Sequence, residues 1–597
     1  IKRSEKALSY NVQQVNTNEI TSNKDANFVN SLSGKVAGVN INASSSGVGG
    51  VSKVVMRGTK SIMQSSNALY VIDGVPIFSG RSTKSGGTEF DSRGSSEPIA
   101  DINPEDIESM SVLTGAAAAA LYGSEAANGA IVITTKKGKE GRVSITVNSN
   151  TEFTSPFIMP RFQTRYGTGM EGVQNVSGAR SWGRKLTETN YFGYSPQDDY
   201  FQTGVIATES VSFSTGTEKN QTYASAAAVN SKGIVPNNKY NRYNFTVRNT
   251  TSFLDDKMTL DFGASYILQN DRNMTNQGTY NNPLVGAYLF PRGNDWEDIS
   301  MYERYDPARK IYTQYWPVGD EAMTMQNPYW VNYRNLRENK KDRYMLNANL
   351  SYQILDWLSV SGRVRLDNSN NDYTEKFYAS TNTQLTEKSS RGLYGITRTN
   401  DKQLYADFLV NVNKMFGETI SLQANVGGSF SDIRSDAMKV RGPIADGTDS
   451  FKGETVGLTN FFAIQNLSPS KTERMQEGWR EQSQSIFASA ELGYKSTYYI
   501  TLTGRNDWPS QLAGPNSKSK SFFYPSVGAS VVLSELMPKL NKDYLSYMKL
   551  RGSWASVGSA FGRYLANPRY EWTANSAQWS IMTQYPLYNL KPERTQS

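Results

Sequence analysis

The stretch INPEDIESMSVLTGAAAAALYGSEAANGAIVITTKKG, residues 102–138, decides how the N-terminal part of the chain is interpreted. It begins with a helix-start signal, because Asn103 can cap a helix and Pro104 suits the first helical position. An apolar segment at residues 107–113 follows, and then five consecutive alanines and a small-residue turn. The stretch ends in an apolar strand at residues 130–134, which two lysines and a glycine stop. It therefore predicts a helix, a turn and a strand of a small α+β domain.

Shorter elements precede this stretch. Residues 27–41 predict a short helix that runs through Gly34 into a strand, and residues 51–57 and 69–72 predict two more strands. Asp73-Gly74 is a turn signal directly after the last of these. We expect residues 1–140 to form one small mixed domain, and its long polar, glycine-rich loops suit a functional role.

Composition excludes several classes of protein. The 597 residues contain no histidine and no cysteine, which rules out histidine bases, thiol nucleophiles, disulfides and metals held by those residues. No run approaches the roughly 18 apolar residues that a membrane-spanning helix needs. The mean hydropathy is −0.55, but a β-barrel can have such a value because only every second strand residue faces lipid. The 35 Tyr, 24 Phe and 10 Trp residues could supply the aromatic girdles of a barrel.

Charge and motifs indicate neither an enzyme nor a nucleic-acid-binding protein. The net charge of +8 comes from 63 basic residues dispersed among 55 acidic ones, without a long basic tract. The GxGxxG match at residues 167–172 lies in a long loop, so it does not indicate a dinucleotide site. Asp198-Asp199 and Asp255-Asp256 are best interpreted as turn residues, with a calcium role left open. We predict no catalytic residue and no cofactor, and no residue is assigned to a metal.

From residue 141 onward, apolar and polar residues alternate in strand-length segments. Every second residue from Leu358 to Leu366 is apolar or glycine, and the residues between them are polar or charged. The same alternation occurs in residues 258–266, 346–353 and 420–427. A strand of roughly 10 residues with one apolar face can cross a bilayer when tilted. We therefore expect residues 141–597 to form a transmembrane barrel with Arg363 and Arg365 facing the lumen, because arginine facing lipid at mid-depth costs about 2–4 kcal/mol.

The connections between these strands alternate in length. Short turns occur at residues 255–256, 355–356, 415–418 and 493–496, and long polar, aromatic connections occur at residues 154–200, 269–342, 368–402, 431–482 and 506–521. Short turns at one end and long loops at the other are typical of an outer-membrane barrel. About 13 strands can be counted, with one more starting near Leu590, whereas plugged transporters close at roughly 22 strands. Because lipid does not tolerate an open sheet edge, we expect the chain to be a fragment that lacks several hundred C-terminal residues.

Residues 102–138, together with ALYVIDGVPI at residues 68–77 and MRG at residues 56–58, resemble the plug domain of SusC-type, TonB-dependent outer-membrane transporters. The barrel part is similar through its alternating strands and through LKPERTQS at residues 590–597. Residues 1–15 resemble the segment after the TonB box, which would place that box before Ile1. The family commonly has a Lys-Asp pair where Thr114-Gly115 stand here, and Glu125 replaces an often basic residue, so no salt bridge is transferred.

The resemblance implies an all-β membrane protein of the outer membrane, an antiparallel barrel with an α+β plug inside its lumen. It implies active import of a nutrient, an oligosaccharide with oligopeptides as the main alternative, by a Bacteroidetes-type bacterium. It also implies a SusD-like surface lipoprotein as a hinged lid, the TonB–ExbB–ExbD complex as the energy source, and room for a dimer of SusC–SusD units. The alternative from another class, a non-transporting adhesin or structural barrel, has no need of a removable plug.

Two regions are candidate ligand sites. The loop at residues 280–333 is rich in aromatic side chains, among them Trp296, Tyr315 and Trp316, which could stack on sugar rings or anchor a partner protein. The same side chains could instead fold the loop upon itself, and the sequence leaves these roles open. If the plug loop at residues 79–97 faces outward, it could form the floor of a binding cavity with Arg81, Phe90, Asp91 and Arg93.

Overall fold

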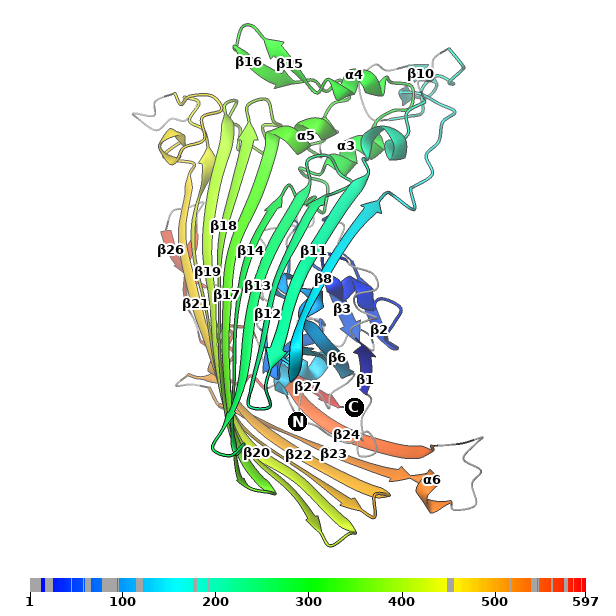
Figure 1. Cartoon of the computed structure of the whole chain (residues 1–597). Helices are drawn as coiled ribbons and strands as arrows, with labels where there is room; N and C mark the ends of the chain where they lie inside the picture. Colours follow the sequence, from blue (N-terminus) through cyan, green and yellow to red (C-terminus); the bar gives the residue numbers. More distant parts are fainter. Residues whose placement is uncertain are drawn as a thin grey trace.

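Two β-sheets dominate the structure, a computed structural model. It describes residues 12–16, 25–43, 46–56, 58, 66–77, 94, 96–113, 122–174, 180–189, 191, 193–321, 323–447, 456–514, 517–537, 545, 547–559, 562–567, 569–573, 578–582, 585–591 and 593–596. A 14-stranded antiparallel sheet curves into a tall wall, and a five-stranded sheet from the N-terminal part lies on its concave side (Figure 1). We call the N-terminal part the plug and the large sheet the wall.

The plug sheet has the strand order β1-β6-β7-β4-β5, and only β4 and β7 pair in parallel. Its members are β1 (Val12–Asn16), β4 (Leu69–Ile72), β5 (Val75–Pro76), β6 (Ile107–Leu113) and β7 (Ala130–Thr135). A separate pair, β2 (Val39–Asn42) and β3 (Lys53–Met56), and the 3-10 turns η2 (Phe28–Leu32), η3 (Pro98–Asp101), η4 (Pro104–Asp106) and η5 (Ser124–Asn128) complete it. Buried apolar side chains of β4, β6, β7 and η2 form one core, so the predicted strands and turn of this region are confirmed.

The predicted helix after Asn103 is wrong. Asn103 does act as a cap, since its side-chain oxygen accepts a hydrogen bond from the Glu105 amide at 3.2 Å, but only the single 3-10 turn η4 follows. The apolar segment then forms strand β6, which pairs with β1 on one edge and β7 on the other. Two neighbouring strands provide hydrogen bonds along both edges, and this tertiary pairing outweighs the local helix-start signal. The alanine run lies outside the described residues.

The wall confirms the predicted strands and their number. Each strand pairs antiparallel with the next in sequence order. Its members are β8 (Gly141–Thr154), β11 (Gly204–Gly216), β12 (Asn220–Lys232), β13 (Lys239–Phe253), β14 (Met258–Arg272), β17 (Asn335–Leu355), β18 (Leu358–Tyr378), β19 (Gly392–Phe416), β20 (Ile420–Pro443), β21 (Glu473–Tyr494), β22 (Tyr498–Pro509), β23 (Phe522–Val532), β24 (Lys549–Ser559) and β27 (Glu593–Gln596).

Several wall strands are much longer than expected. Strands β17 to β21 have 21 to 25 residues, so most of residues 368–402 and a large part of residues 431–482 continue the sheet and do not form loops. At about 3.4 Å per residue, such strands are longer than a tilted bilayer crossing requires. The prediction of strands of roughly 10 residues was therefore wrong for this part of the wall.

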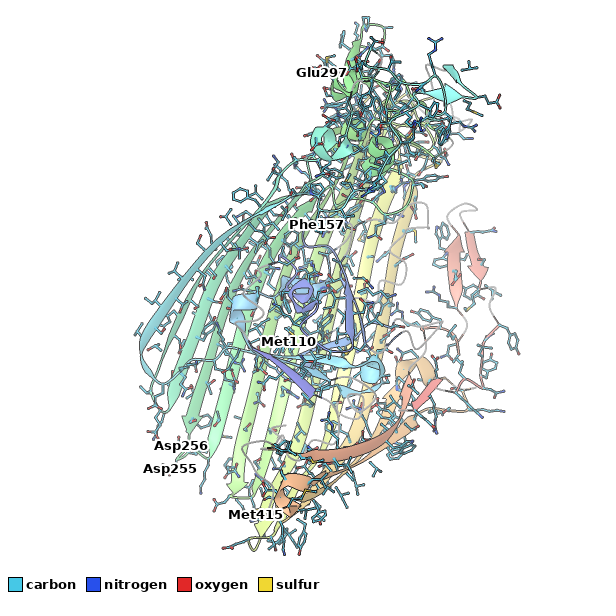
Figure 2. The ribbon with its side chains drawn as sticks, turned by 90° about the vertical axis from the view of Figure 1, so that its right-hand side faces the viewer. Met110, Phe157, Asp255, Asp256, Glu297 and Met415 are labelled. Atoms are coloured by element: carbon cyan, nitrogen blue, oxygen red, sulfur yellow. The ribbon has the colours of Figure 1, made fainter. Side chains whose placement is uncertain are left out.

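Turns and long connections lie at opposite ends of the wall, as predicted. Figure 2 shows Asp255, Asp256 and Met415 at one end and Glu297 at the other. Asp255 and Asp256 have positive φ angles of 51° and 61°, which fits their interpretation as turn residues. The other described elements all lie in connections: β9 (Gly169–Met170), β10 (Val173–Gln174), η6 (Pro196–Tyr200), α3 (Pro283–Leu289), α4 (Trp296–Ser300), β15 (Glu303–Asp306), β16 (Ile311–Gln314), α5 (Pro328–Arg334), η7 (Ile464–Asn466), η8 (Ser510–Leu512), α6 (Leu533–Leu536), β25 (Tyr570–Thr573) and β26 (Gln578–Ile581).

The GxGxxG segment forms strand β9 and the turn that leads into β10, and no helix follows among residues 180–189, the next described ones, so its interpretation as a loop is confirmed. Within the described ranges, no helix has the length and apolar character to cross a membrane.

Candidate functional site: the plug seat and the outer aromatic cluster

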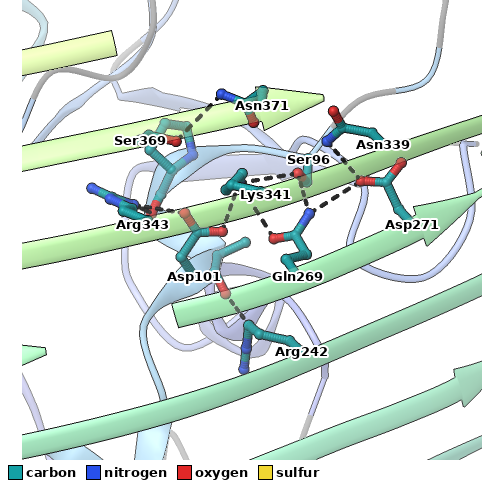
Figure 3. A network of polar contacts seen from close by, with 12 residues as sticks. Ser96, Asp101, Arg242, Gln269, Asp271, Asn339, Lys341, Arg343, Ser369 and Asn371 are labelled. Carbon is teal, nitrogen blue, oxygen red and sulfur yellow. Dashed lines mark hydrogen bonds and ion pairs between the residues drawn. The ribbon is translucent and has the colours of Figure 1, made fainter. Parts of the chain in front are cut away.

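A carboxylate of the plug is held between two cations of the wall. Asp101, at the end of η3, has no solvent-exposed surface. Its carboxylate accepts hydrogen bonds from Lys341 Nζ at 2.8 Å and from Arg343 Nη1 at 2.7 Å, both on β17 (Figure 3). Arg343 also donates to both oxygens of Asp367 on β18, at 2.9 and 2.7 Å. A buried ion pair with this many hydrogen bonds fixes the position of the plug segment against the wall.

Backbone carbonyls of this plug segment, and that of Ala26, are also bonded to the wall. Arg242 on β13 donates through Nη1 to the carbonyls of Ala26, at 3.0 Å, and of Ala100. Asn244 donates to the Asp101 carbonyl at 2.6 Å. Because each of these donors lies on an inward-facing position of the wall, the segment is held by β13 and β17 together. We call the wall residues that bond the plug the plug seat.

A second part of the plug seat holds the turn at Asp73. Arg363 donates to the Asp73 carbonyl at 2.7 Å, and Arg365 donates to the Ile72 carbonyl at 3.3 Å. Arg248 connects the Asp73 carboxylate, at 3.2 Å, to Asp261 of the wall, at 2.7 Å. These contacts confirm the prediction that Arg363 and Arg365 face the lumen.

Gly74 allows the close approach of Arg363 to this turn. Its φ of +81° is unfavourable for other residues, and a Cβ there would collide with the Arg363 guanidinium. The turn signal predicted from Asp73-Gly74 therefore also serves the contact with the wall.

Buried carboxyl groups inside the plug are held in polar networks. Glu97 accepts hydrogen bonds from Asn27 Nδ2 at 2.6 Å and from the Ser52 amide at 3.1 Å, yet burial raises its pKa above the usual value. Burial likewise raises the pKa values of Asp25 and Asp106. The plug thus buries carboxyl groups whose ionised form is disfavoured by their surroundings.

An aromatic cluster forms in the connections at the other end of the wall. It is built from Tyr194, Tyr200, Phe290, Trp296 and Tyr329, which come from two separate long connections. Trp296 stacks on Tyr194 with ring centroids 4.1 Å apart and donates to the Tyr329 hydroxyl at 3.3 Å. Only 7% of Trp296 is exposed. This residue therefore folds the outer connections together.

Tyr315 and Trp316 lie at the edge of the aromatic cluster and are partly buried. The Arg304 guanidinium lies 3.3 Å above the Tyr315 ring, and the Trp316 indole donates to the Gly319 carbonyl at 2.8 Å. A ligand-binding role for these two side chains stays a prediction. The four predicted plug-loop residues lie outside the described residues: Arg81, Phe90, Asp91 and Arg93.

The sequence analysis missed most of the plug seat. Lys341 and Arg343 stand two residues apart, as Arg363 and Arg365 do, so both pairs fall on one strand face. Charged residues on the face opposite the apolar one are the signal that could have identified Lys341 and Arg343. Their partner Asp101 has no comparable signal, since it precedes them by 240 and 242 residues.

Comparison with known proteins agrees with the sheet and plug just described. Residues 4–130 match the model of the TonB-dependent Receptor Plug Domain family. SusC of Bacteroides thetaiotaomicron, a TonB-dependent receptor, is 27% identical over 334 residues, which is 54% of this chain and 30% of SusC. Its plug is that of a TonB-dependent receptor, and its relatives are SusC-like. With this plug and this strand-rich wall, the chain is an outer-membrane protein.

Other relatives match most of the chain. TonB-dependent receptor P26 of Formosa agariphila is 24% identical over 558 residues, 92% of this SusC-like chain and 51% of the relative. The RagAB peptide importer in its open-open state has a TM-score of 0.72 at 20% identity, covering 100% of this chain and 65% of that one. At this identity the likeness establishes the fold. The chain spans about half the length of the curated relatives that it matches along most of its sequence.

Proposed function

We propose that the protein imports a nutrient oligomer across the outer membrane by TonB-dependent active transport. The observation that carries this proposal is the plug, a separate sheet seated against the inner face of the wall by ion pairs and hydrogen bonds. Polar groups of this kind can exchange their partners for water when the plug leaves its seat. Apolar side chains of the plug also pack on Ala555 and Val557 of β24. A barrel that served only as an adhesin or a scaffold would have no use for such an internal domain.

The coupling and partners follow from this proposal. The TonB–ExbB–ExbD complex would pull on the segment that precedes the plug, and a SusD-like lipoprotein would close the outer end as a lid. The division into a plug at residues 1–140 and a barrel at residues 141–597 is part of the same proposal. Arg81, Phe90, Asp91 and Arg93 would face the cargo from the plug, with Tyr315 and Trp316 at the outer end.

We favour an oligosaccharide as the cargo, because the outer connections are rich in tyrosine and tryptophan, whose faces stack on sugar rings. An oligopeptide is the second candidate, and the structural likeness to the RagAB peptide importer favours it. Native mass spectrometry on protein extracted gently from its own outer membrane distinguishes the two. A ladder of sugar masses supports the first candidate, and a distribution of peptide masses supports the second.

An engineered disulfide tests whether the plug must move. The Thr275 amide, in the connection that follows β14, donates to the Ser46 carbonyl of the plug at 2.9 Å. Two residues joined by such a hydrogen bond are close enough for a disulfide, which spans roughly 5–6 Å between Cα atoms. Because the chain has no cysteine, Ser46→Cys with Thr275→Cys introduces one specific pair.

We expect cells with the oxidised pair to lose uptake and to regain it after reduction with dithiothreitol. The two single-cysteine variants are the controls and should transport normally. Full uptake by the oxidised pair would contradict the proposed mechanism.

A further inference from the structure

The outward face of the wall changes character partway along its long strands. On β19, Leu404, Phe408 and Val410 point outward, whereas the next outward positions towards the long connections are Lys402 and Asn400. Gln403, which lies between Lys402 and Leu404, points inward and donates to the plug carbonyl of Pro76 at 3.2 Å. Since side chains alternate between the two faces of a strand, Lys402 and Leu404 point outward. The apolar part fits lipid chains, so Lys402 marks the outer border of the lipid-facing band.

Three cations lie side by side from this border outward. Lys402 on β19 is opposite Arg434 on β20, and Arg434 is opposite Arg480 on β21. These three strands are neighbours in the wall (Figure 1), and all three side chains are exposed. Opposite residues in a sheet have Cβ atoms about 5 Å apart, and like charges at that separation repel each other.

Carboxylates neutralise only part of this row. Arg480 forms an ion pair with Asp432, which also accepts from Gln482 at 2.9 Å. Arg434 interacts with the charge of Asp432 only at longer range, and no carboxylate described in the wall lies within ion-pair distance of Lys402 or Arg434. The row therefore leaves two adjacent, exposed cations without a bonded anion.

Some outward cations of the same region do have such a partner. Arg398, further out on β19, pairs with Asp372 at 3.4 Å, and Arg272 on β14 pairs with Glu338 at 3.7 Å. Lys340, exposed on the outward side of β17, has no ion pair among the described residues either. Lys402 and Arg434 differ from it in their position, because Lys402 is the first outward residue of β19 beyond the apolar Leu404. A site at this border meets the headgroups of the outer leaflet first.

We infer that Lys402 and Arg434 bind a phosphate group of an outer-leaflet glycolipid, whose acyl chains lie along the apolar band below. One phosphate between the two side chains would accept hydrogen bonds from both and remove their mutual repulsion. Arg480 and Asp432 flank this site as an already formed pair. The site does not depend on the proposed transport function, since it lies on the opposite face of the wall from the plug.

The test uses the intact protein, extracted from its outer membrane into mild detergent. Bisphosphorylated lipid A is titrated into it, binding is followed by native mass spectrometry, and fully dephosphorylated lipid A is the ligand control. We expect Lys402→Gln with Arg434→Gln to bind the phosphorylated lipid about thirtyfold more weakly, about fivefold for each cation. Arg398→Gln is the matched protein control and should bind as the wild type does.

A second variant guards against a folding artefact. Lys402→Glu places opposite charges at a register pair, so it should fold at least as well as the wild type while losing the lipid. Equal binding by the wild type and the double variant would overturn the inference. Equal binding of phosphorylated and dephosphorylated lipid A would also overturn it. The same holds if the wild type retains a second protein chain that the double variant loses while both bind lipid equally.

Discussion

Removing the Asp101 carboxylate should loosen the plug from its seat. In Asp101→Ala, Lys341 and Arg343 lose a buried anion at 2.8 and 2.7 Å, and breaking a buried pair in this way costs about 3–5 kcal/mol. Arg343 keeps its ion pair with Asp367, so the lower end of this range applies. A loss of about 3 kcal/mol in docking free energy raises the population of the undocked plug segment by a factor of roughly 150.

Hydrogen exchange measured by mass spectrometry on the intact protein reports this population. Amides of the plug around residues 97–102 should exchange faster in Asp101→Ala by about two orders of magnitude when opening and closing are fast. Asp342→Ala is the matched control, because Asp342 lies on the same strand as Lys341 but is exposed on the outward side. Adding Lys341→Met to Asp101→Ala should recover part of the loss, because it removes the unpaired buried charge. The same exchange rate in Asp101→Ala and Asp342→Ala would refute the reasoning.

Three further predictions concern other parts of the molecule. Val360→Arg should reduce the folded fraction seen as heat-modifiable migration on gels, because arginine facing lipid costs about 2–4 kcal/mol, whereas Ser361→Arg on the inward side should fold normally. Because burial raises the pKa of Glu97, the folded plug binds its proton more tightly than the unfolded plug does, so plug stability should fall as pH rises above the usual value of 4.5. Glu97→Gln should flatten that part of the pH profile in urea unfolding, and an unchanged slope would count against it. Trp296→Ala should destabilise the outer connections by about 3–5 kcal/mol and speed their cleavage by protease, whereas unchanged cleavage with weakened cargo binding would make Trp296 a ligand residue instead.

The alternation of apolar and polar residues predicts the wall strands only along the part where one face of the wall meets lipid. From Leu358 to Leu366 the outward residues are apolar or glycine, and the direction of Arg363 and Arg365 follows from that pattern. Beyond Asn368 both faces meet water or polar neighbours, so the alternation ends although the strand continues to Tyr378. For this reason the outer halves of the long strands were mistaken for loops.

The candidate site depends on contacts between distant parts of the chain. Asp101 and Lys341 meet only because the wall curves around the plug, and no local pattern in either segment encodes that meeting. The burial of Trp296 is similar, since its stacking partner Tyr194 comes from a different connection. Aromatic content identified the region, but only packing distinguishes a structural tryptophan from an exposed one.

The long strands also constrain how the outer rim of this protein can vary through insertions. Adding two residues to each of two paired strands would raise the rim by about 7 Å and leave every remaining side chain on its original face. Adding a single residue would instead turn all the residues beyond it to the opposite face, and inward polar groups would change places with outward ones. Height changes in the sheet between β17 and β21 are therefore expected in steps of two residues, while insertions of any length are confined to the connections.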